Sequence, residues 1–137
     1  MKHELEEGPL LQLDFSKIGQ IAAKCSDVIP VAVQNADTKE VILVAYVNET
    51  ALQTAISTRT AVFWSTSRNE LWVKGQTSGE TFELLEVYVN CEQNSLVYMV
   101  RPRKGGICHT KNLNGEPRNC YYRRLNFTTG KLENINP

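Results

Sequence analysis

Apolar residues recur along this chain at two different spacings, and each spacing predicts a different kind of element. From Phe15 to Lys24 the apolar side chains recur at near-helical intervals, which indicates a short amphipathic segment. Elsewhere, β-branched and aromatic residues form compact runs of the kind that strands prefer. These runs predict strands at 28–34, 41–47, 61–65, 71–74, 81–89, 95–100 and 121–127.

One clear helix is expected immediately after the second predicted strand. Asn48 suits the N-cap position because its side-chain oxygen can accept a hydrogen bond from the first turn. Glu49 then places a negative charge where the helix dipole favours it. The helix should cover residues 49–57 and turn three apolar side chains toward the core: Leu52, Ala55 and Ile56.

The connections between these elements indicate the fold class. The polar segment 35–39 has turn chemistry, so the first two strands are expected to form a hairpin. Pro30 indicates a sheet edge or a strand start, because proline lacks a backbone N–H. Since no strand–helix–strand alternation follows, the order predicts an α+β domain, mainly an antiparallel sheet or roll with one clear helix.

The two ends of the chain carry weaker signals. Residues 1–12 are expected to form an N-terminal arm, and residues 13–137 a single domain. Segment 104–119 is rich in glycine, asparagine and charge, which indicates a loop. Segment 121–127 is expected to close the sheet.

Composition narrows the classes of function. The 137 residues are 42% hydrophobic and 22% charged with a formal net charge of zero, as in ordinary globular domains. A balanced charge does not favour a nucleic-acid or membrane-surface role, and no stretch approaches the roughly 20 apolar residues of a membrane span. The N-terminal residues lack the apolar segment of a secretory signal, so the expected compartment is the cytoplasm.

Charge is nevertheless uneven. Between Arg101 and Arg124 seven basic residues accompany a single acidic one, Glu116. This segment is either a solvated loop, which is the commoner case, or a pocket for an anionic ligand that bears phosphate. The basic residues are Arg101, Arg103, Lys104, Lys111, Arg118, Arg123 and Arg124.

Three of the four cysteines fall near predicted loops or strand ends, at Cys91, Cys108 and Cys120. Three thiolates can hold a tetrahedral zinc and leave one position open. Their spacing matches no common zinc-finger pattern, and buried structural cysteines are the alternative. Cys25 is expected in the core, whereas His109, beside Cys108, is a candidate for proton transfer.

A second candidate site lies in the run WSTSRNELWVKGQTSGE, at residues 64–80. Aromatic residues in such a run are most often core. Here they alternate with hydroxyls, basic side chains and glycine, which can cradle a phosphate while a ring stacks on a base. The candidate substrate-binding residues in this run are Trp64, Ser65, Ser67, Arg68, Lys74, Ser78 and Gly79.

The same run resembles the pattern WSRSRxxLWxKGExSGH of the phosphoribosyl-AMP cyclohydrolases. Upstream, LDFSK and IPVAVQ, followed by LVAYVNETAL, are similar to the family's LDF, IPAIVQ and LAYMN-x-EAL. Downstream, NCEQNSLVY resembles DCDxDALL, and CHT followed by CYYRR resembles CHTG…SCFYR. The resemblance runs in order over roughly residues 11–125.

The resemblance implies a zinc-dependent hydrolase of histidine biosynthesis that opens the N1–C6 bond of phosphoribosyl-AMP or a related N-substituted purine nucleotide. Zinc falls on the three cysteines and is shared between two subunits, which implies an intertwined homodimer with the metal at its interface. His109 and Glu80 become the candidate catalytic residues, and Arg123 joins the substrate-binding set.

Several positions depart from the family pattern. Its three magnesium aspartates fall on Asn90, Glu92 and Asn94, which makes magnesium possible but doubtful because it prefers carboxylates. Glu80 replaces the histidine of SGH, and Thr66 replaces an arginine of WSRSR. The alternative is therefore a non-catalytic, zinc-stabilised paralogue that binds a nucleotide or a partner. A nucleic-acid binder is the least favoured reading.

Overall fold

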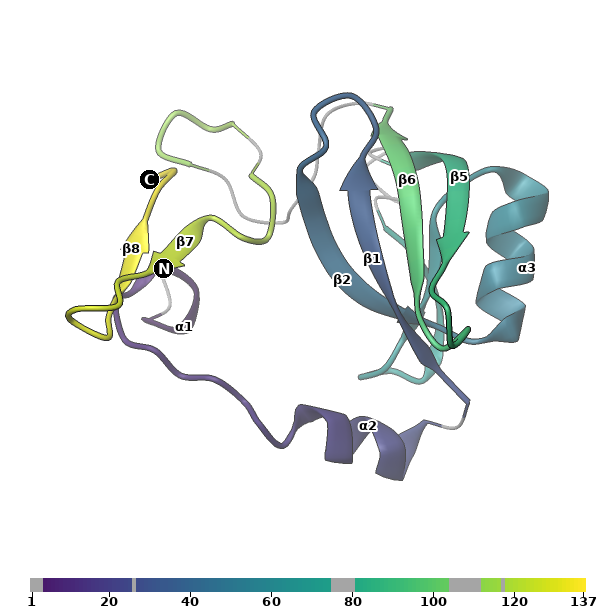
Figure 1. Cartoon of the computed structure of the whole chain (residues 1–137), viewed down its shortest axis with the longest axis horizontal. Helices are drawn as coiled ribbons and strands as arrows, with labels where there is room; N and C mark the ends of the chain where they lie inside the picture. The colour runs from purple at the N-terminus through teal and green to yellow at the C-terminus, as the bar shows by residue number, and fades with distance from the viewer. Residues whose placement is uncertain (1–3, 26, 75–80, 104–111, 117) are drawn as a thin grey trace.

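The computed structural model describes residues 4–25, 27–74, 81–103, 112–116 and 118–137. Over these residues it contains three helices and eight strands (Figure 1). They are α1 (Glu4–Glu7), α2 (Lys17–Lys24), β1 (Ile29–Asn35), β2 (Val41–Val47), α3 (Glu49–Thr58), β3 (Val62–Ser65), β4 (Glu70–Val73), β5 (Phe82–Val89), β6 (Leu96–Pro102), β7 (Arg123–Leu125) and β8 (Leu132–Asn134).

The principal sheet has four strands in the order β2-β1-β6-β5. The predicted β1–β2 hairpin is confirmed and is antiparallel, as is the β5–β6 pair. β1 and β6 run parallel, so the sheet is mixed. Pro30 therefore marks a strand start, because β1 is an interior strand whose pairing with β6 begins only at Val31.

Helix α3 begins where the sequence predicts. The Asn48 side chain accepts a hydrogen bond from the backbone N–H of Ala51 at 2.9 Å, which satisfies one of the free donors of the first turn. The core-facing residues are Ala51 and Ala55, with Leu52 partly buried. The expectation for Ile56 was wrong, because its side chain is 39% exposed and small alanines let the helix approach the sheet closely.

The core lies between the principal sheet, α3 and the β3–β4 hairpin. Its largest fully buried apolar side chains belong to five elements of this layer, and Phe63 packs at 5.5 Å from the Trp72 ring and 5.7 Å from the Tyr98 ring. Burial of each such side chain contributes about 1.5–3 kcal/mol. These side chains include Val31, Val33, Ile42, Val47, Val62, Phe63, Phe82, Tyr98 and Val100.

The segment 121–127 does not close the principal sheet, contrary to the prediction. Its strand β7 pairs only with β8, in a separate two-stranded sheet. Local turn chemistry explains this choice, since the Asn126 side chain accepts hydrogen bonds from the backbone N–H groups of Thr128 and Thr129. Gly130 then adopts φ +71°, which completes a short hairpin.

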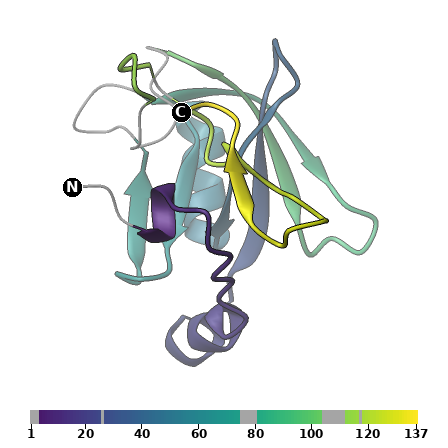
Figure 2. The ribbon, with the colours of Figure 1, turned by 90° about the vertical axis from the view of Figure 1, so that its left-hand side faces the viewer.

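Residues from both ends of the chain lie together. Helix α1 is beside β7 and β8 in two perpendicular views (Figures 1 and 2), and the backbone N–H of Leu132 donates to Pro9 O at 2.8 Å. We call α1, residues 112–116 and 118–122, and the β7–β8 hairpin the terminal clasp. One backbone hydrogen bond, from Cys120 N–H to Ile42 O at 2.9 Å, joins the clasp to β2.

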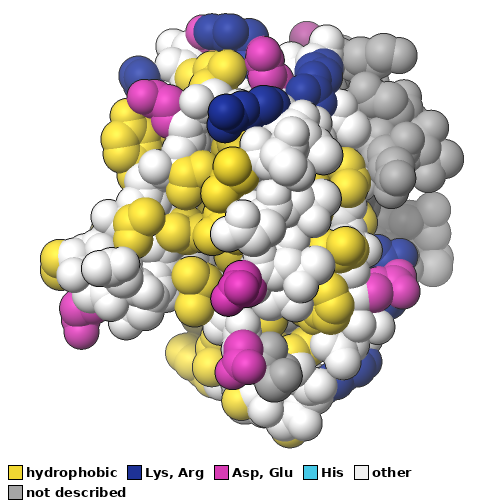
Figure 3. Space-filling model, turned by 90° about the vertical axis from the view of Figure 1, so that its right-hand side faces the viewer, with side chains coloured by type: hydrophobic (Ala, Val, Ile, Leu, Met, Phe, Trp, Pro, Cys, Tyr) yellow, Lys and Arg dark blue, Asp and Glu magenta, His cyan; other side chains and the backbone are white. Residues whose placement is uncertain are grey.

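The surface on the side of α3 and β5 carries mixed chemistry (Figure 3). Small groups of apolar side chains alternate with polar atoms, and Lys and Arg side chains gather along its upper edge. None of the helices in the described ranges is long and apolar enough to cross a membrane.

Candidate functional site

The β3–β4 hairpin forms one wall of a cavity of about 450 Å³. The hairpin turn is held by Asn69, whose side chain accepts a hydrogen bond from Trp64 Nε1 at 2.9 Å and whose backbone has φ +55°. β2 and the first residue of α2 complete the cavity. Its lining residues are Lys17, Val44, Ala45, Tyr46, Trp64, Ser65, Thr66, Ser67, Arg68 and Trp72.

The turn of this hairpin presents hydroxyls and a guanidinium together. Ser65 Oγ accepts hydrogen bonds from the backbone N–H of Arg68 at 3.3 Å and from its Nε at 3.4 Å. Arg68 also lies 3.5 Å from Glu70, and both side chains are more than half exposed. The guanidinium is thus oriented but open to solvent, which suits it to receive a phosphate.

The aromatic side of the cavity rests on the core. Trp64 and Trp72 are partly exposed, and Trp72 is backed by the buried Phe63. Phe63 is backed in turn by Tyr98, whose hydroxyl donates to Val62 O at 3.2 Å and whose pKa is raised by burial. A ring supported in this way offers a fixed face for a purine base.

Four predicted substrate-binding residues therefore line one cavity: Trp64, Ser65, Ser67 and Arg68. Lys74 lies beside it, with Nζ 6.0 Å from the centre of the Trp72 ring. Ser78, Gly79, Glu80, Cys108 and His109 lie outside the described residues. No pattern in the sequence assigns Lys17, Val44, Ala45 or Tyr46 to this site, because residues of distant segments meet here only through the fold. Thr66 and Trp72 belong to the predicted run 64–80 but are not among its candidate substrate-binding residues.

Arg123, the remaining predicted substrate contact, lies elsewhere. It lines a smaller cavity of about 260 Å³ together with Cys120, Tyr121 and leucines of the N-terminal arm. Its guanidinium donates to Gly8 O at 3.1 Å and lies 5.6 Å from the Tyr122 ring centre. The pKa of Tyr121 is raised mainly by partial burial and to a smaller extent by the neighbouring Cys120.

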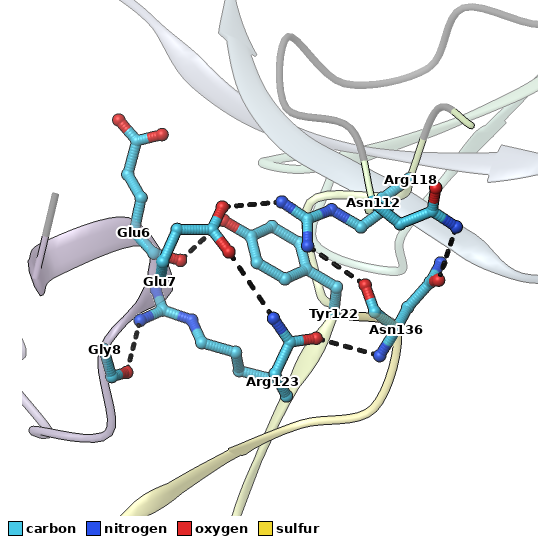
Figure 4. Close-up of polar contacts among 9 residues, drawn as sticks. Glu6, Glu7, Gly8, Asn112, Arg118, Tyr122, Arg123 and Asn136 are labelled. Atoms are coloured by element: carbon cyan, nitrogen blue, oxygen red, sulfur yellow. Dashed lines mark hydrogen bonds and ion pairs between the residues drawn. The ribbon is translucent and has the colours of Figure 1, made fainter. Parts of the chain in front are cut away.

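A buried arginine organises the terminal clasp (Figure 4). Arg118 is 2% exposed, and its guanidinium contacts Glu7 at 2.7 Å and the backbone oxygen of Asn136 at 3.0 Å. The same group lies 3.7 Å from the centre of the Tyr122 ring, whose hydroxyl donates to Glu6 O at 2.7 Å. One side chain thus joins the N-terminal helix, the cysteine-bearing loop and the C-terminus.

The basic segment resolves largely into structural contacts. Arg101 forms a two-point ion pair with Asp37 at 3.0 Å, and its hydrogen bonds lower the pKa of Asp37. Arg103 donates to Thr60, Thr81 and the backbone oxygen of Arg59. With Arg118 and Arg123 in the clasp, the structure favours structural roles over a phosphate pocket for these described arginines.

The two described cysteines of the predicted zinc set, Cys91 and Cys120, lie far apart within one chain. Cys91 is exposed in the β5–β6 turn. The strand pairing across β6 and β1 aligns this turn with Ala45, near the end of β2. Cys120 is exposed near Ile42, at the start of β2. At about 3.4 Å per residue and 4.8 Å per strand they lie on the order of 20 Å apart, whereas two sulfurs on one zinc lie about 4 Å apart.

Thiolate sulfur is a common ligand of zinc, so the cysteines suit this metal chemically. Cys91 and Cys120 of a single chain, however, are too far apart to bind the same zinc ion. Over the described part of the chain, no group of three or more His, Cys, Asp and Glu side chains gathers closely enough to hold a metal. Cys25 is buried, as expected, and its thiol lies 3.4 Å from Thr66 O.

The degenerate magnesium positions are occupied by a hydrogen-bonded turn. Asn90 Nδ2 donates to Asn94 Oδ1 at 2.7 Å, while Asn90 Oδ1 accepts from the backbone N–H groups of Asn94 and Ser95. Both amide oxygens are therefore already engaged, and Glu92 is the one carboxylate of the three. This arrangement does not fit a magnesium site, because Mg²⁺ selects carboxylate oxygens in octahedral geometry.

Comparison with known proteins gives the family. The family model for phosphoribosyl-AMP cyclohydrolase matches residues 43–122. A phosphoribosyl-AMP cyclohydrolase of Hyphomonas neptunium is 42% identical over 88% of this chain and 81% of that protein, and one of Nitrosopumilus maritimus is 42% identical over 82% and 93%. A histidine biosynthesis bifunctional protein of Thermus thermophilus is 46% identical over 71% of this chain and 42% of that protein. The chain therefore belongs to the phosphoribosyl-AMP cyclohydrolase family.

Proposed function

We propose that this protein is a phosphoribosyl-AMP cyclohydrolase of histidine biosynthesis. It adds water to C6 of the N1-substituted adenine, after which the N1–C6 bond breaks. Relatives about 40% identical over most of their length carry this name. The proposal is supported by the cavity where two tryptophans, several hydroxyls and Arg68 meet, because aromatic rings can stack on a purine base and a guanidinium with hydroxyls can bind phosphate.

Substrate binding follows from the chemistry of this cavity. Its volume of about 450 Å³ lies in the range of small-molecule sites. Arg68 and the hydroxyls of Ser65 and Ser67 bind a phosphate group, and Trp64 and Trp72 contact the purine. Each of these roles concerns binding and orientation, and places the reacting C6 in a fixed position.

The proposed metal is zinc, held by Cys91, Cys108 and Cys120. Bound zinc would lower the pKa of a coordinated water to about 7. His109 would hold and transfer a proton at the purine ring, a role that suits an imidazole. Glu80 assists as a base, because its carboxylate replaces the histidine of the family's SGH sequence.

The proposed assembly is a homodimer with zinc at the interface. Its support is the separation of the cysteines, since Cys91 of one protomer can meet Cys120 of its partner even though the two are distant within a chain. Large apolar side chains also remain exposed just before α2 and on the clasp, including Phe15 at 91% and Phe127 at 94%. Exposed apolar surface of this kind is typical of protein interfaces.

We also propose that magnesium does not bind at Asn90 and Asn94. The side chains of Asn90 and Asn94 are joined directly by a hydrogen bond. Two carboxylates at these positions would repel each other and would need a cation between them. The consequence is an enzyme whose activity does not depend on magnesium at this turn.

The test is to follow ring opening of phosphoribosyl-AMP by ultraviolet absorbance, with purified protein of measured zinc content. We expect turnover with and without magnesium, and a loss of zinc and of activity in Cys108→Ser. The matched control is Cys25→Ser, which removes a buried thiol outside the proposed ligand set. Turnover and zinc content unchanged in Cys108→Ser would contradict the proposed metal site, and inactive wild-type protein with bound zinc would contradict the proposed reaction.

A further inference from the structure

Helix α2 carries a basic residue into the nucleotide cavity. Lys17 is the first residue of this helix and lines the cavity with Arg68 and the serines of the β3–β4 turn. It reaches the site from the N-terminal part of the chain, far in sequence from the WSTSR run. Nothing in the spacing of that run points to it.

The far end of α2 is attached to the same turn. The Lys24 ammonium donates to Ser67 O, and the Cys25 thiol lies 3.4 Å from Thr66 O. At the near end, Asp14 accepts hydrogen bonds from the Ser16 backbone and hydroxyl, at 3.0 and 2.5 Å. The helix is therefore held against the turn that presents Arg68, and its first residue is carried to the opening of the cavity.

The charge of Lys17 is left available for a ligand. It forms no ion pair with any other residue in the described ranges, and no acidic residue lines the cavity. The acidic residue nearest to Lys17 along the chain is Asp14, which accepts hydrogen bonds from Ser16. These hydrogen bonds lower the pKa of Asp14 more than the charge of Lys17 does. An exposed ammonium with three donors binds phosphate well as a point charge.

We propose that Lys17 binds a phosphate group of the substrate, as the second cation of the cavity beside Arg68. This inference rests on the proposed function, because phosphoribosyl-AMP carries two separate phosphate groups, and two cations from separate elements give each phosphate its own partner. Lys17 contributes to binding rather than to the chemical step. It thereby favours a doubly phosphorylated nucleotide over one with a single phosphate.

The test compares Lys17→Gln with Lys17→Arg and with Lys131→Gln, which removes an equal charge from the exposed β7–β8 turn. For Lys17→Gln we expect KM for phosphoribosyl-AMP to rise about 10- to 100-fold, the range of one charged hydrogen bond, with kcat within about twofold. Lys17→Arg should retain most of the affinity, Lys131→Gln all of it, and zinc content should not change. Equal KM values for Lys17→Gln and Lys131→Gln, or a fall confined to kcat, would overturn the proposal.

A second measurement separates this proposal from the proposed reaction. Both tryptophans of the chain line the cavity, so their fluorescence reports ligand binding without turnover. If the wild-type protein does not open phosphoribosyl-AMP, the proposed reaction fails, and a fluorescence titration with phosphoribosyl-AMP itself, which carries both phosphates, decides the role of Lys17. Weaker binding in Lys17→Gln than in Lys131→Gln would then support a phosphate contact, and equal binding would refute it.

Discussion

The principal sheet and the terminal clasp are stabilised by opposite kinds of chemistry. Residues around Phe63 and Tyr98 form an apolar core in which side chains from six elements exclude water. The clasp instead depends on one buried arginine, Arg118, and on hydrogen bonds to Glu7 and Asn136. An apolar core tolerates small shifts, whereas a buried charge requires its partners in place. The two regions should therefore lose stability in different ways when mutated.

The largest effect is expected in the core. Phe63→Ala removes a fully buried ring that supports Trp72 and Tyr98, and should lower the free energy of unfolding by about 3–5 kcal/mol. Denaturant titration measures this loss, which should be global. The matched control, Ile56→Ala on the exposed side of α3, should cost less than about 1 kcal/mol. A local rather than global loss for Phe63→Ala would contradict a single cooperative core.

In the clasp, Arg118→Met should cost about 3 kcal/mol, because the partly buried carboxylate of Glu7 loses its partner. The loss should be local, and hydrogen exchange should accelerate in α1 and the β7–β8 hairpin while β1 and β6 remain protected. Adding Glu7→Leu should restore part of the stability, since no unpaired charge would then remain. Equal acceleration in the principal sheet would contradict the separation of the two regions.

A smaller effect is expected at the β5–β6 turn. The double change Asn90→Asp with Asn94→Asp replaces a hydrogen bond with two facing carboxylates, and should cost about 1 kcal/mol. Added magnesium should recover this loss in the double variant and leave the wild-type melting temperature unchanged. Asn48→Asp is the control, because aspartate caps α3 equally well. Magnesium stabilisation of the wild type would show that the turn already binds the cation.

The smallest effect concerns acid. Hydrogen bonds from Arg101 hold the pKa of Asp37 below its ordinary value of 3.8, so the ionised carboxyl stabilises the folded state. This contribution is present above the ordinary value and is lost as pH falls through the lower folded pKa. Asp37→Asn should therefore reduce the slope of stability against pH as the pH falls below about 3.8. Because the pair is exposed, an unchanged slope would mean that solvent screens it completely.

What the sequence predicts well is local. The Asn48 cap, the β1–β2 hairpin and the WSTSR turn each depend on neighbours in the chain, and each was found where the pattern indicated. The parallel β1–β6 pair and the separate β7–β8 sheet depend on contacts between distant segments, which periodicity does not encode. Lys17 and Arg118 belong to the same class, since their partners become neighbours only after folding. The proposed ligand roles of the cysteines follow from the family resemblance and not from their spacing.

We propose that the active site forms between two copies of the chain, with Cys91 from the sheet of one and Cys120 from the clasp of the other. This proposal is tested most directly by refolding Cys91→Ser and Cys120→Ser together and measuring zinc content and phosphoribosyl-AMP ring opening against each variant alone. A shared site leaves one intact set of ligands in each mixed dimer, so random pairing should recover about a quarter of the wild-type zinc sites and activity. No recovery above the separate variants, with mixed dimers present, would place all three cysteines in one chain and contradict the account.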